Sequence, residues 1–122
     1  MSRFQTIRRE QTSAEERANT LTHGVGLLLS VASISVIIVL AALRRDPWVI
    51  TACAIYGTTL ILLYAASTAY HHVRSPRAKR IWNVLDHGAI YLLVAGTYTP
   101  FTLGTLRRAA GWGWSLFGAI WL

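Results

Sequence analysis

The sequence predicts an all-α fold, that of a polytopic helical membrane protein. Hydrophobic residues make up 53% of the 122 residues and charged residues 14%, against roughly 25% charged residues in soluble domains. The charged residues gather between long neutral runs, and the mean hydropathy is positive at +0.40. The net charge of +7 comes from cations spread over several short segments, which membrane topology explains better than nucleic-acid binding. We therefore expect membrane lipids, and no nucleic acid, as partners.

Residues 1–20 are polar and are predicted to form an amino-terminal segment with a surface helix. Ser13, followed three residues later by Glu16, fits a capping box that would start this helix. The arginines of the segment could instead belong to a signal peptide. However, the apolar run that follows is too long for one and ends in no clear cleavage site. We therefore expect the helix to lie on the membrane surface and to lead into the first span.

Residues 21–122 are predicted to form the membrane domain. The first span, residues 21–43, contains no Asp, Glu, Lys or Arg and covers about 35 Å as a helix, enough to cross a hydrocarbon core of roughly 30 Å. The second and third spans are expected at about 47–70 and 82–106, with a kink in the third at Pro100. Residues 109–122 begin a fourth span that reaches only about 21 Å. The sequence thus ends inside a hydrophobic segment, as expected of a fragment or of a truncated gene product.

The distribution of cations predicts the orientation in the membrane. The amino-terminal segment and the segment between the second and third spans carry four cations each, whereas the two other loops carry two each. Segments rich in Lys and Arg favour the cytoplasmic side. We therefore expect a cytoplasmic amino terminus.

A serine, a histidine and a carboxylate are expected to meet near this cytoplasmic surface. Ser67 and His71 are four residues apart, so they share one face of the second predicted helix. The basic segment at residues 73–80 contains four cations and a proline, and we expect it to remain in water and to turn the chain back. This turn returns Asp86 to about the membrane depth of His71.

Three further polar residues are expected at the same surface as a supporting polar cluster. They follow one another on one face of the first helix, at offsets of three and seven from the first of them: Glu16, Asn19 and His23. The alternative for Asn19 and His23 is that they only tie the surface helix to the bundle by hydrogen bonds.

The residues near the second and third spans also have simpler interpretations. Asp86 is four residues from Trp82 and could lie among the lipid headgroups. An aspartate deeper in the membrane raises the free energy of insertion by roughly 2.5–3.5 kcal/mol, so a residue retained there is expected to have a function. Ser67 could bond its own backbone one turn back. His71 could merely mark the helix end, as the adjacent His72 does. The common depth of these residues favours a polar site.

These residues resemble the hemolysin III family, which belongs with the progestin and adipoQ receptors. The resemblance covers nearly the whole chain. It rests on three patterns: Glu16-x-x-Asn19-x-x-x-His23, Ser67-x-x-x-His71, and Asp86 followed by GAIYLLVAGTYTPF at residues 88–101. It implies a seven-span helical bundle in a bacterial plasma membrane, with the amino terminus inside. This chain would supply three full spans and a truncated fourth.

The resemblance also implies a zinc ion near the cytoplasmic side, held by three histidines. His71 matches the histidine of the second span, and the other two belong to an H-x-x-x-H motif on the last span, which this sequence does not contain. Asp86 matches the acidic residue that interacts with the zinc-bound water, and Ser67 matches the serine beside the site. Both are therefore candidate catalytic residues. A catalytic zinc normally has three protein ligands, so the zinc site is expected to be incomplete in this chain.

Three functions from different classes are open at this point. In the first, the complete protein is a zinc-dependent hydrolase of a lipid amide or ester. In the second, as the family name suggests, it is a membrane-permeabilising cytolysin, although a pore needs a polar lining that these apolar spans do not provide. In the third, the chain is an inactive truncated remnant. Zinc-dependent hydrolysis would favour the first function, and dye release from liposomes without product formation would favour the second.

Overall fold

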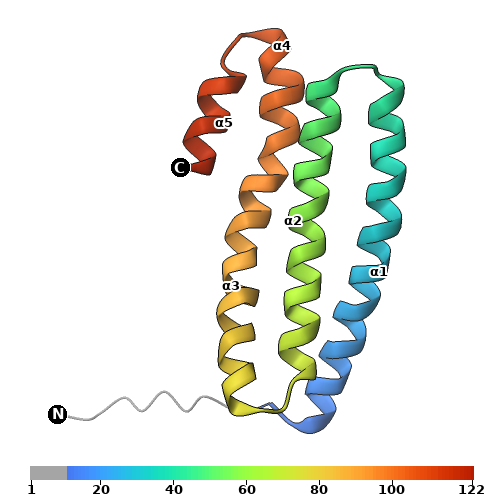
Figure 1. Ribbon diagram of the computed structural model, residues 1–122, viewed down its shortest axis with the longest axis vertical. Coiled ribbons are helices and arrows are strands. Elements are labelled where there is room, and N and C mark those ends of the chain that lie inside the picture. The colour runs from blue at the N-terminus through green and yellow to red at the C-terminus, as the bar shows by residue number, and fades with distance from the viewer. Residues whose placement is uncertain (1–10) are drawn as a thin grey trace, which may run out of the picture.

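The computed structural model describes residues 11–122, which form helices and no strand. Each of the three long helices runs antiparallel to the one before it, and the middle one packs against both others (Figure 1). A short final helix turns back along the third. The elements, in chain order, are α1 (Ser13–Leu43), α2 (Pro47–His72), α3 (Pro76–Thr99), the π-helix η1 (Pro100–Leu106), α4 (Arg107–Ala109) and α5 (Gly113–Trp121).

Three helical segments are long and apolar enough to cross a membrane: Ser13–Leu43, Pro47–His72 and Pro76–Ala109. Large apolar side chains cover the outside of the bundle, and small residues fill most of its interior. Small residues at helix contacts allow the close packing that is typical of membrane helices, and the apolar exterior suits lipid. The small buried residues are Ala41, Ala52, Gly57, Ala66, Ala89, Ala95 and Gly96.

The capping box of α1 forms one residue earlier than predicted. Thr12 is the N-cap: its hydroxyl accepts a hydrogen bond from the Glu15 backbone N–H at 3.2 Å, and Glu15 Oε2 accepts one from the Thr12 N–H at 2.7 Å. The assignment of the box to Ser13 and Glu16 is therefore wrong. This difference has a consequence for the site, because Glu16 is not used at the helix start and reaches the neighbouring helices instead.

α1 continues without interruption across the boundary expected near Thr20. The surface helix and the first span predicted on either side of that residue are thus one helix of 31 residues, about 46 Å long. The cations at Arg3, Arg8 and Arg9, which contributed to the predicted orientation, lie outside the described residues.

The basic turn between the second and third helices is shorter than predicted. Only residues 73–75 separate α2 from α3, because Pro76 occupies the first position of α3, where its missing N–H costs nothing. α3 thus begins six residues before the span start expected at Trp82. Arg77, Lys79 and Arg80 consequently lie on the first turns of α3 and not in a loop.

Asp46 connects the turn between α1 and α2 to the end of the third span. Its Oδ1 accepts a hydrogen bond from the Trp48 backbone N–H at 2.9 Å, which caps α2. Its Oδ2 accepts from Arg107 Nη2 at 2.7 Å and from Arg108 Nε at 2.9 Å. The hydrogen bonding by Arg108 holds the pKa of the Asp46 carboxyl below its usual value. The carboxylate therefore stays ionised and fixes this end of the bundle.

The α-helical part of the third span ends at Thr99, and Pro100 begins η1, so the chain stays helical through the position at which the kink is predicted. Proline has no backbone N–H to donate to the carbonyl four residues earlier, and its ring would clash with that carbonyl. The chain therefore continues from Pro100 as the π-helical segment η1. After α4 the chain turns through Gly111, whose φ is +71°. The partial fourth span expected at residues 109–122 is the nine-residue helix α5. Trp121 Nε1 of α5 donates to Thr99 Oγ1 of α3 at 3.0 Å, which holds α5 against the third span.

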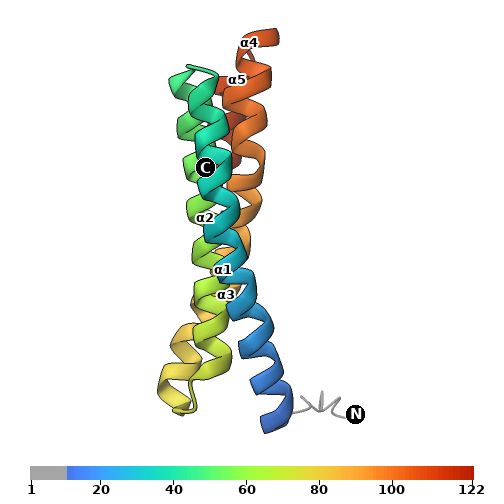
Figure 2. The ribbon, with the colours of Figure 1, turned by 90° about the vertical axis from the view of Figure 1, so that its right-hand side faces the viewer.

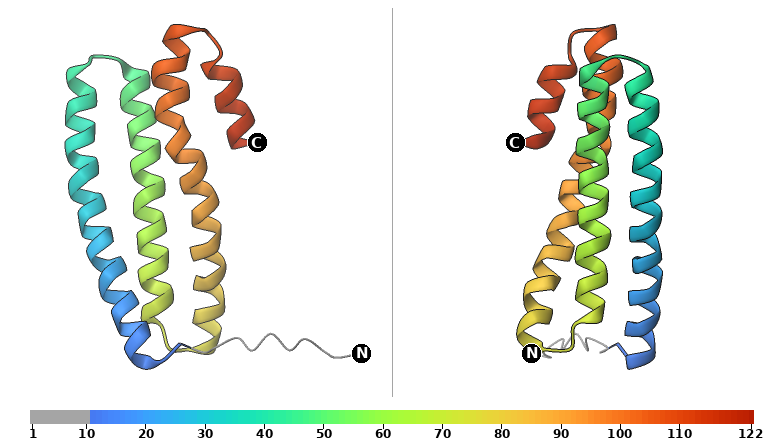
Figure 3. Two further views of the ribbon diagram at one scale, coloured as in Figure 1. Left: turned by 180° about the vertical axis from the view of Figure 1, so that it is seen from behind. Right: turned by 45° about the vertical axis from the view of Figure 1, so that its right-hand side comes forward.

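The three long helices form a single layer, with α2 between α1 and α3 in both views of Figure 3. Seen edge-on, the start of α1 leans away from the start of α3 (Figure 2). The last turn of α2 therefore faces a different neighbour on each side. This arrangement determines which polar side chains can meet at that end of the bundle.

Candidate functional site

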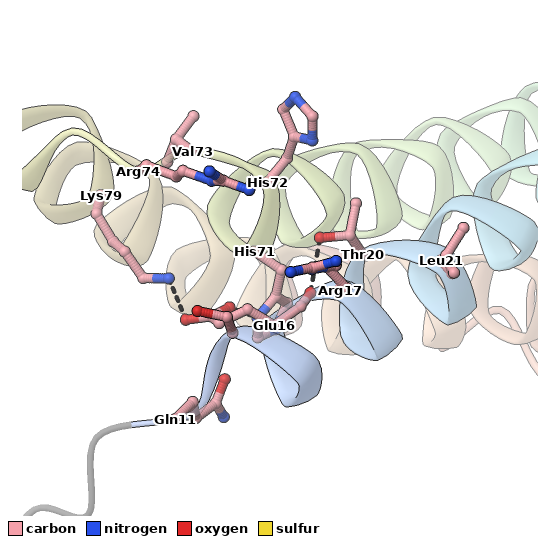
Figure 4. Close-up of a pocket in the computed structure, with 11 residues that line it drawn as sticks. Gln11, Glu16, Arg17, Thr20, Leu21, His71, His72, Val73, Arg74 and Lys79 are labelled. Atoms are coloured by element: carbon pink, nitrogen blue, oxygen red, sulfur yellow. Dashed lines mark hydrogen bonds and ion pairs between the residues drawn. The ribbon is translucent and has the colours of Figure 1, made fainter.

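A carboxylate joins all three long helices at the end where α2 stops. Glu16 lies in the first turn of α1, and its Oε2 is 2.8 Å from Nδ1 of His71 in the last turn of α2. Its Oε1 accepts a hydrogen bond from Nζ of Lys79, on α3 (Figure 4). The side chains of His71 and Glu16 are 10% and 21% exposed, so both are largely withdrawn from solvent.

The contact with Glu16 determines how the imidazole of His71 can act. An ionised carboxylate only accepts hydrogen bonds, so Nδ1 carries the hydrogen. In the neutral ring this leaves a lone pair on Nε2, which makes no hydrogen bond with any residue of 11–122. Histidines that bind metals generally donate their other ring N–H in this way, to a carboxylate or carbonyl that fixes the tautomer and the ring orientation.

His23 of α1 packs against the same imidazole. Its ring centroid lies 5.3 Å from that of His71 and 6.2 Å from that of Tyr64, both in edge-on geometry. His23 Nδ1 is buried and has no hydrogen-bond partner among residues 11–122. Buried polar atoms normally have a partner, so the Nδ1 of His23 is an exception, and it belongs to the ring that packs against His71.

Two of the other residues predicted for the first and second helices lie differently. Asn19 Nδ2 donates to Gln11 Oε1 at 3.3 Å, so this side chain is directed toward the beginning of the helix. Ser67 lies one turn before His71 on α2 and is 4% exposed. Of the supporting polar cluster, Glu16 and His23 therefore contact His71, and Asn19 bonds elsewhere.

Asp86 is not the carboxylate that meets His71 in the described part of the chain. Its side chain is 15% exposed, and within residues 11–122 its ion-pair partner is His87, with Nδ1 4.0 Å from Oδ2. His87 Nδ1 also lies 2.8 Å from the Asn83 carbonyl oxygen. Asp86 forms no hydrogen bond or ion pair with His71 among the described residues.

Sequence reasoning missed Lys79. Its ammonium group contacts Glu16 and also lies 4.8 Å from the ring centroid of Tyr70, a distance typical of a cation–π interaction. An acidic residue at an end of the bundle that is rich in cations indicates a paired cation. Four cations stand within residues 73–80, however, and the sequence contains no signal that selects one of them.

The donors in the described residues fit one part of a zinc site. His71 offers an imidazole nitrogen on a ring that Glu16 orients, and imidazole nitrogen is one of the donors that zinc binds. Residues 11–122 contain no group of three or more His, Cys, Asp or Glu side chains placed to hold a metal ion. The remaining ligands of any such site would have to come from outside these residues.

The apolar helices and the polar cluster at one end of the bundle define an integral membrane protein of the helical class. The chain belongs to the haemolysin-III related family, whose model matches residues 11–122. This confirms the resemblance identified in the sequence.

Two relatives illustrate the match. The chain is 42% identical over 114 residues to Hemolysin-3 of Bacillus cereus. The aligned region covers 93% of this chain and 51% of that protein. It is 42% identical over 110 residues to the Hemolysin-3 homolog of Bacillus subtilis (strain 168). The aligned region covers 90% of this chain and 51% of that protein. The chain thus spans about half the length of the curated relatives it matches. No solved structure matches it.

Proposed function

We propose that the complete protein is a zinc-dependent membrane hydrolase of lipid amides or esters, and that this chain supplies His71 as one zinc ligand. The observation that carries the proposal is the 2.8 Å contact between His71 Nδ1 and Glu16 Oε2, which leaves Nε2 available to a metal. A second observation supports a polar ligand near these rings: the buried Nδ1 of the adjacent His23 has no hydrogen-bond partner among residues 11–122. When bound, zinc supplies a polarising charge and a water with a pKa lowered to about 7.

The residues of this chain have separate roles in the proposal. Glu16 holds the His71 ring, and the Lys79 ammonium balances the Glu16 charge. Asp86 accepts a proton from the attacking water as general base, and the Ser67 hydroxyl donates a hydrogen bond to the oxyanion that develops on the substrate carbonyl. Both of these roles require the complete bundle to bring Asp86 and Ser67 toward the substrate.

Hydrolysis can be tested in a chimera that joins residues 11–122 to the remaining half of a related haemolysin. Reconstituted into vesicles that contain a ceramide-type amide and a lipid ester, the chimera is expected to release fatty acid when zinc is added and to stop when zinc is chelated. Product formation is measured by mass spectrometry, and a second set of vesicles reports leakage of an entrapped dye.

The His72→Ala chimera serves as a control and is expected to retain activity, because His72 makes no contact with Glu16. Dye release without fatty acid would contradict the hydrolase and favour the cytolysin. If neither fatty acid nor dye is released by a folded, zinc-loaded chimera, the hydrolase proposal is also wrong, and the inactive remnant is favoured.

We also propose that the amino terminus lies in the cytoplasm of a bacterial plasma membrane. This orientation is supported by the excess of cations at the end of the bundle that holds the candidate site. A reporter fused after Arg80 is expected to be active in the cytoplasm, and one fused after Arg45 outside it. The reverse pattern would contradict the orientation. Neutralising the four cations of the basic segment is expected to weaken the preference: Arg74, Arg77, Lys79 and Arg80.

A further inference from the structure

A groove of about 760 Å³ lies between the start of α1 and the turn that follows α2. Its walls include Arg17 of α1 and Arg74 of the turn, both of which are exposed (Figure 4). Neither arginine side chain forms an ion pair or a hydrogen bond with another residue of 11–122. Two guanidinium groups from separate elements thus face one hollow with their hydrogen-bonding capacity unused.

The groove carries an excess of positive charge. Among its lining residues within 11–122, Glu16 is the acidic one, and the Lys79 ammonium already contacts it. Arg17 and Arg74 therefore remain uncompensated by the other lining residues. Guanidinium groups bind phosphate oxygens through paired hydrogen bonds, so the chemistry of the groove fits a phosphate group.

An apolar strip continues from Arg17 along the outer face of α1. Leu21 is 70% exposed and also lines the groove, and Val25 and Leu28 follow it, 54% and 73% exposed. Spacings of four, four and three residues place all four side chains on one face of the helix. A phosphate-binding end followed by an exposed apolar strip matches the shape of a phospholipid, whereas a soluble phosphate compound would use only the arginines.

We propose that this groove binds the headgroup of an anionic phospholipid, with its phosphate held by Arg17 and Arg74 and an acyl chain lying along the strip from Leu21 to Leu28. The inference does not rest on the proposed hydrolysis, because binding of this lipid needs neither zinc nor a reaction. Its failure and the failure of the hydrolase proposal are therefore distinguishable.

The test uses the 122-residue chain in phosphatidylcholine vesicles doped with spin-labelled phosphatidylglycerol or spin-labelled phosphatidylcholine. Electron paramagnetic resonance measures the fraction of each labelled lipid held by the protein. The wild-type chain is expected to prefer phosphatidylglycerol. Because each cation near an anionic lipid strengthens binding by about fivefold, and because the two guanidinium groups also lose their hydrogen bonds to the phosphate, the double variant Arg17→Gln, Arg74→Gln is expected to lower this preference by roughly 25-fold or more.

The matched control is the double variant Arg77→Gln, Arg80→Gln. It removes the same charge from the same end of the bundle, but neither residue lines the groove. Its preference for phosphatidylglycerol is expected to fall by a clearly smaller factor than in the groove variant, since it weakens only the diffuse surface potential and removes no hydrogen bond to the phosphate. An equal loss in both double variants would show diffuse attraction and overturn the site, as would a wild-type chain without any preference.

Two further arms keep the test decisive. Inorganic phosphate added at constant ionic strength is expected to leave the preference unchanged, and if it abolishes the preference the lipid assignment is wrong.

If the glutamine variant fails to insert, the variant Arg17→Lys, Arg74→Lys keeps the charge but removes the paired hydrogen bonds. It is expected to lose at least half of the preference, whereas Arg77→Lys, Arg80→Lys loses none. An unchanged preference in the first lysine variant would overturn the proposal.

Discussion

Replacing Gly96 by Ala is expected to destabilise the bundle by about 1–3 kcal/mol. A Cβ at this position would lie 2.1 Å from Oγ1 and 3.0 Å from Cβ of Thr59 on α2. Thr59 is 5% exposed, and its hydroxyl donates to the Tyr56 carbonyl at 2.8 Å, so it cannot turn aside without losing this bond. The helices α2 and α3 would therefore have to separate at this contact.

Gly88 provides the matched control on the same helix. A Cβ at Gly88 meets no atom of the described residues within 4 Å, so Gly88→Ala is expected to stabilise α3 by about 0.5–1 kcal/mol through its higher helix propensity. Reversible unfolding in mixed micelles, followed by circular dichroism, measures both free energies. Changes of the same sign in the two variants would contradict the close approach of α2 and α3.

His71→Ala is expected to remove the bound zinc from the chimera, because it deletes one of three protein ligands. Asp86→Asn is expected to retain most of the metal and to lose most of the hydrolytic rate, since the carboxylate acts on the water and not as a ligand. Ser67→Ala is expected to have the mildest effect, because it removes a single hydrogen-bonding group. The zinc content of each purified variant and its rate of fatty-acid release measure these effects.

Two neighbouring histidines serve as controls for this series. His72 is exposed at the end of α2, and the side chain of His87 is 64% exposed on α3. Both alanine variants are expected to bind zinc as the wild type does. Stoichiometric zinc in His71→Ala, together with its loss in His72→Ala or His87→Ala, would show that the wrong histidine has been assigned.

Much of the helical architecture could be predicted from the sequence, because span length and the absence of charge are local properties. The errors lie where two local patterns compete. Thr12 with Glu15 and Ser13 with Glu16 fit the capping-box pattern equally well, and only the folded chain selects the first pair. The early start of α3 is not evident from the sequence, because a proline such as Pro76 suits a turn as well as the first position of a helix.

The candidate site was predictable only in part, since it depends on which helices are neighbours. Helical spacing placed Glu16 and His23 on one face of α1, and both contact His71 in the structure. The spacing could not show which side chains of α1 and α3 reach the last turn of α2, and therefore that Glu16 is the carboxylate that contacts His71. The pairing of Lys79 with Glu16 likewise depends on the tertiary arrangement.

The central claim is that Glu16 of α1 orients His71 of α2 for metal binding. The most direct test is the dissociation constant of zinc, measured by competition with a chelator of known affinity, for the chimera and its Glu16→Gln and Lys79→Gln variants. Glu16→Gln is expected to weaken zinc binding by roughly 10- to 100-fold, because it removes the carboxylate that fixes the ring. Lys79→Gln is expected to bind zinc no more weakly than the wild type, since Glu16 then contacts His71 without a competing cation. Wild-type zinc affinity in Glu16→Gln would contradict the claim.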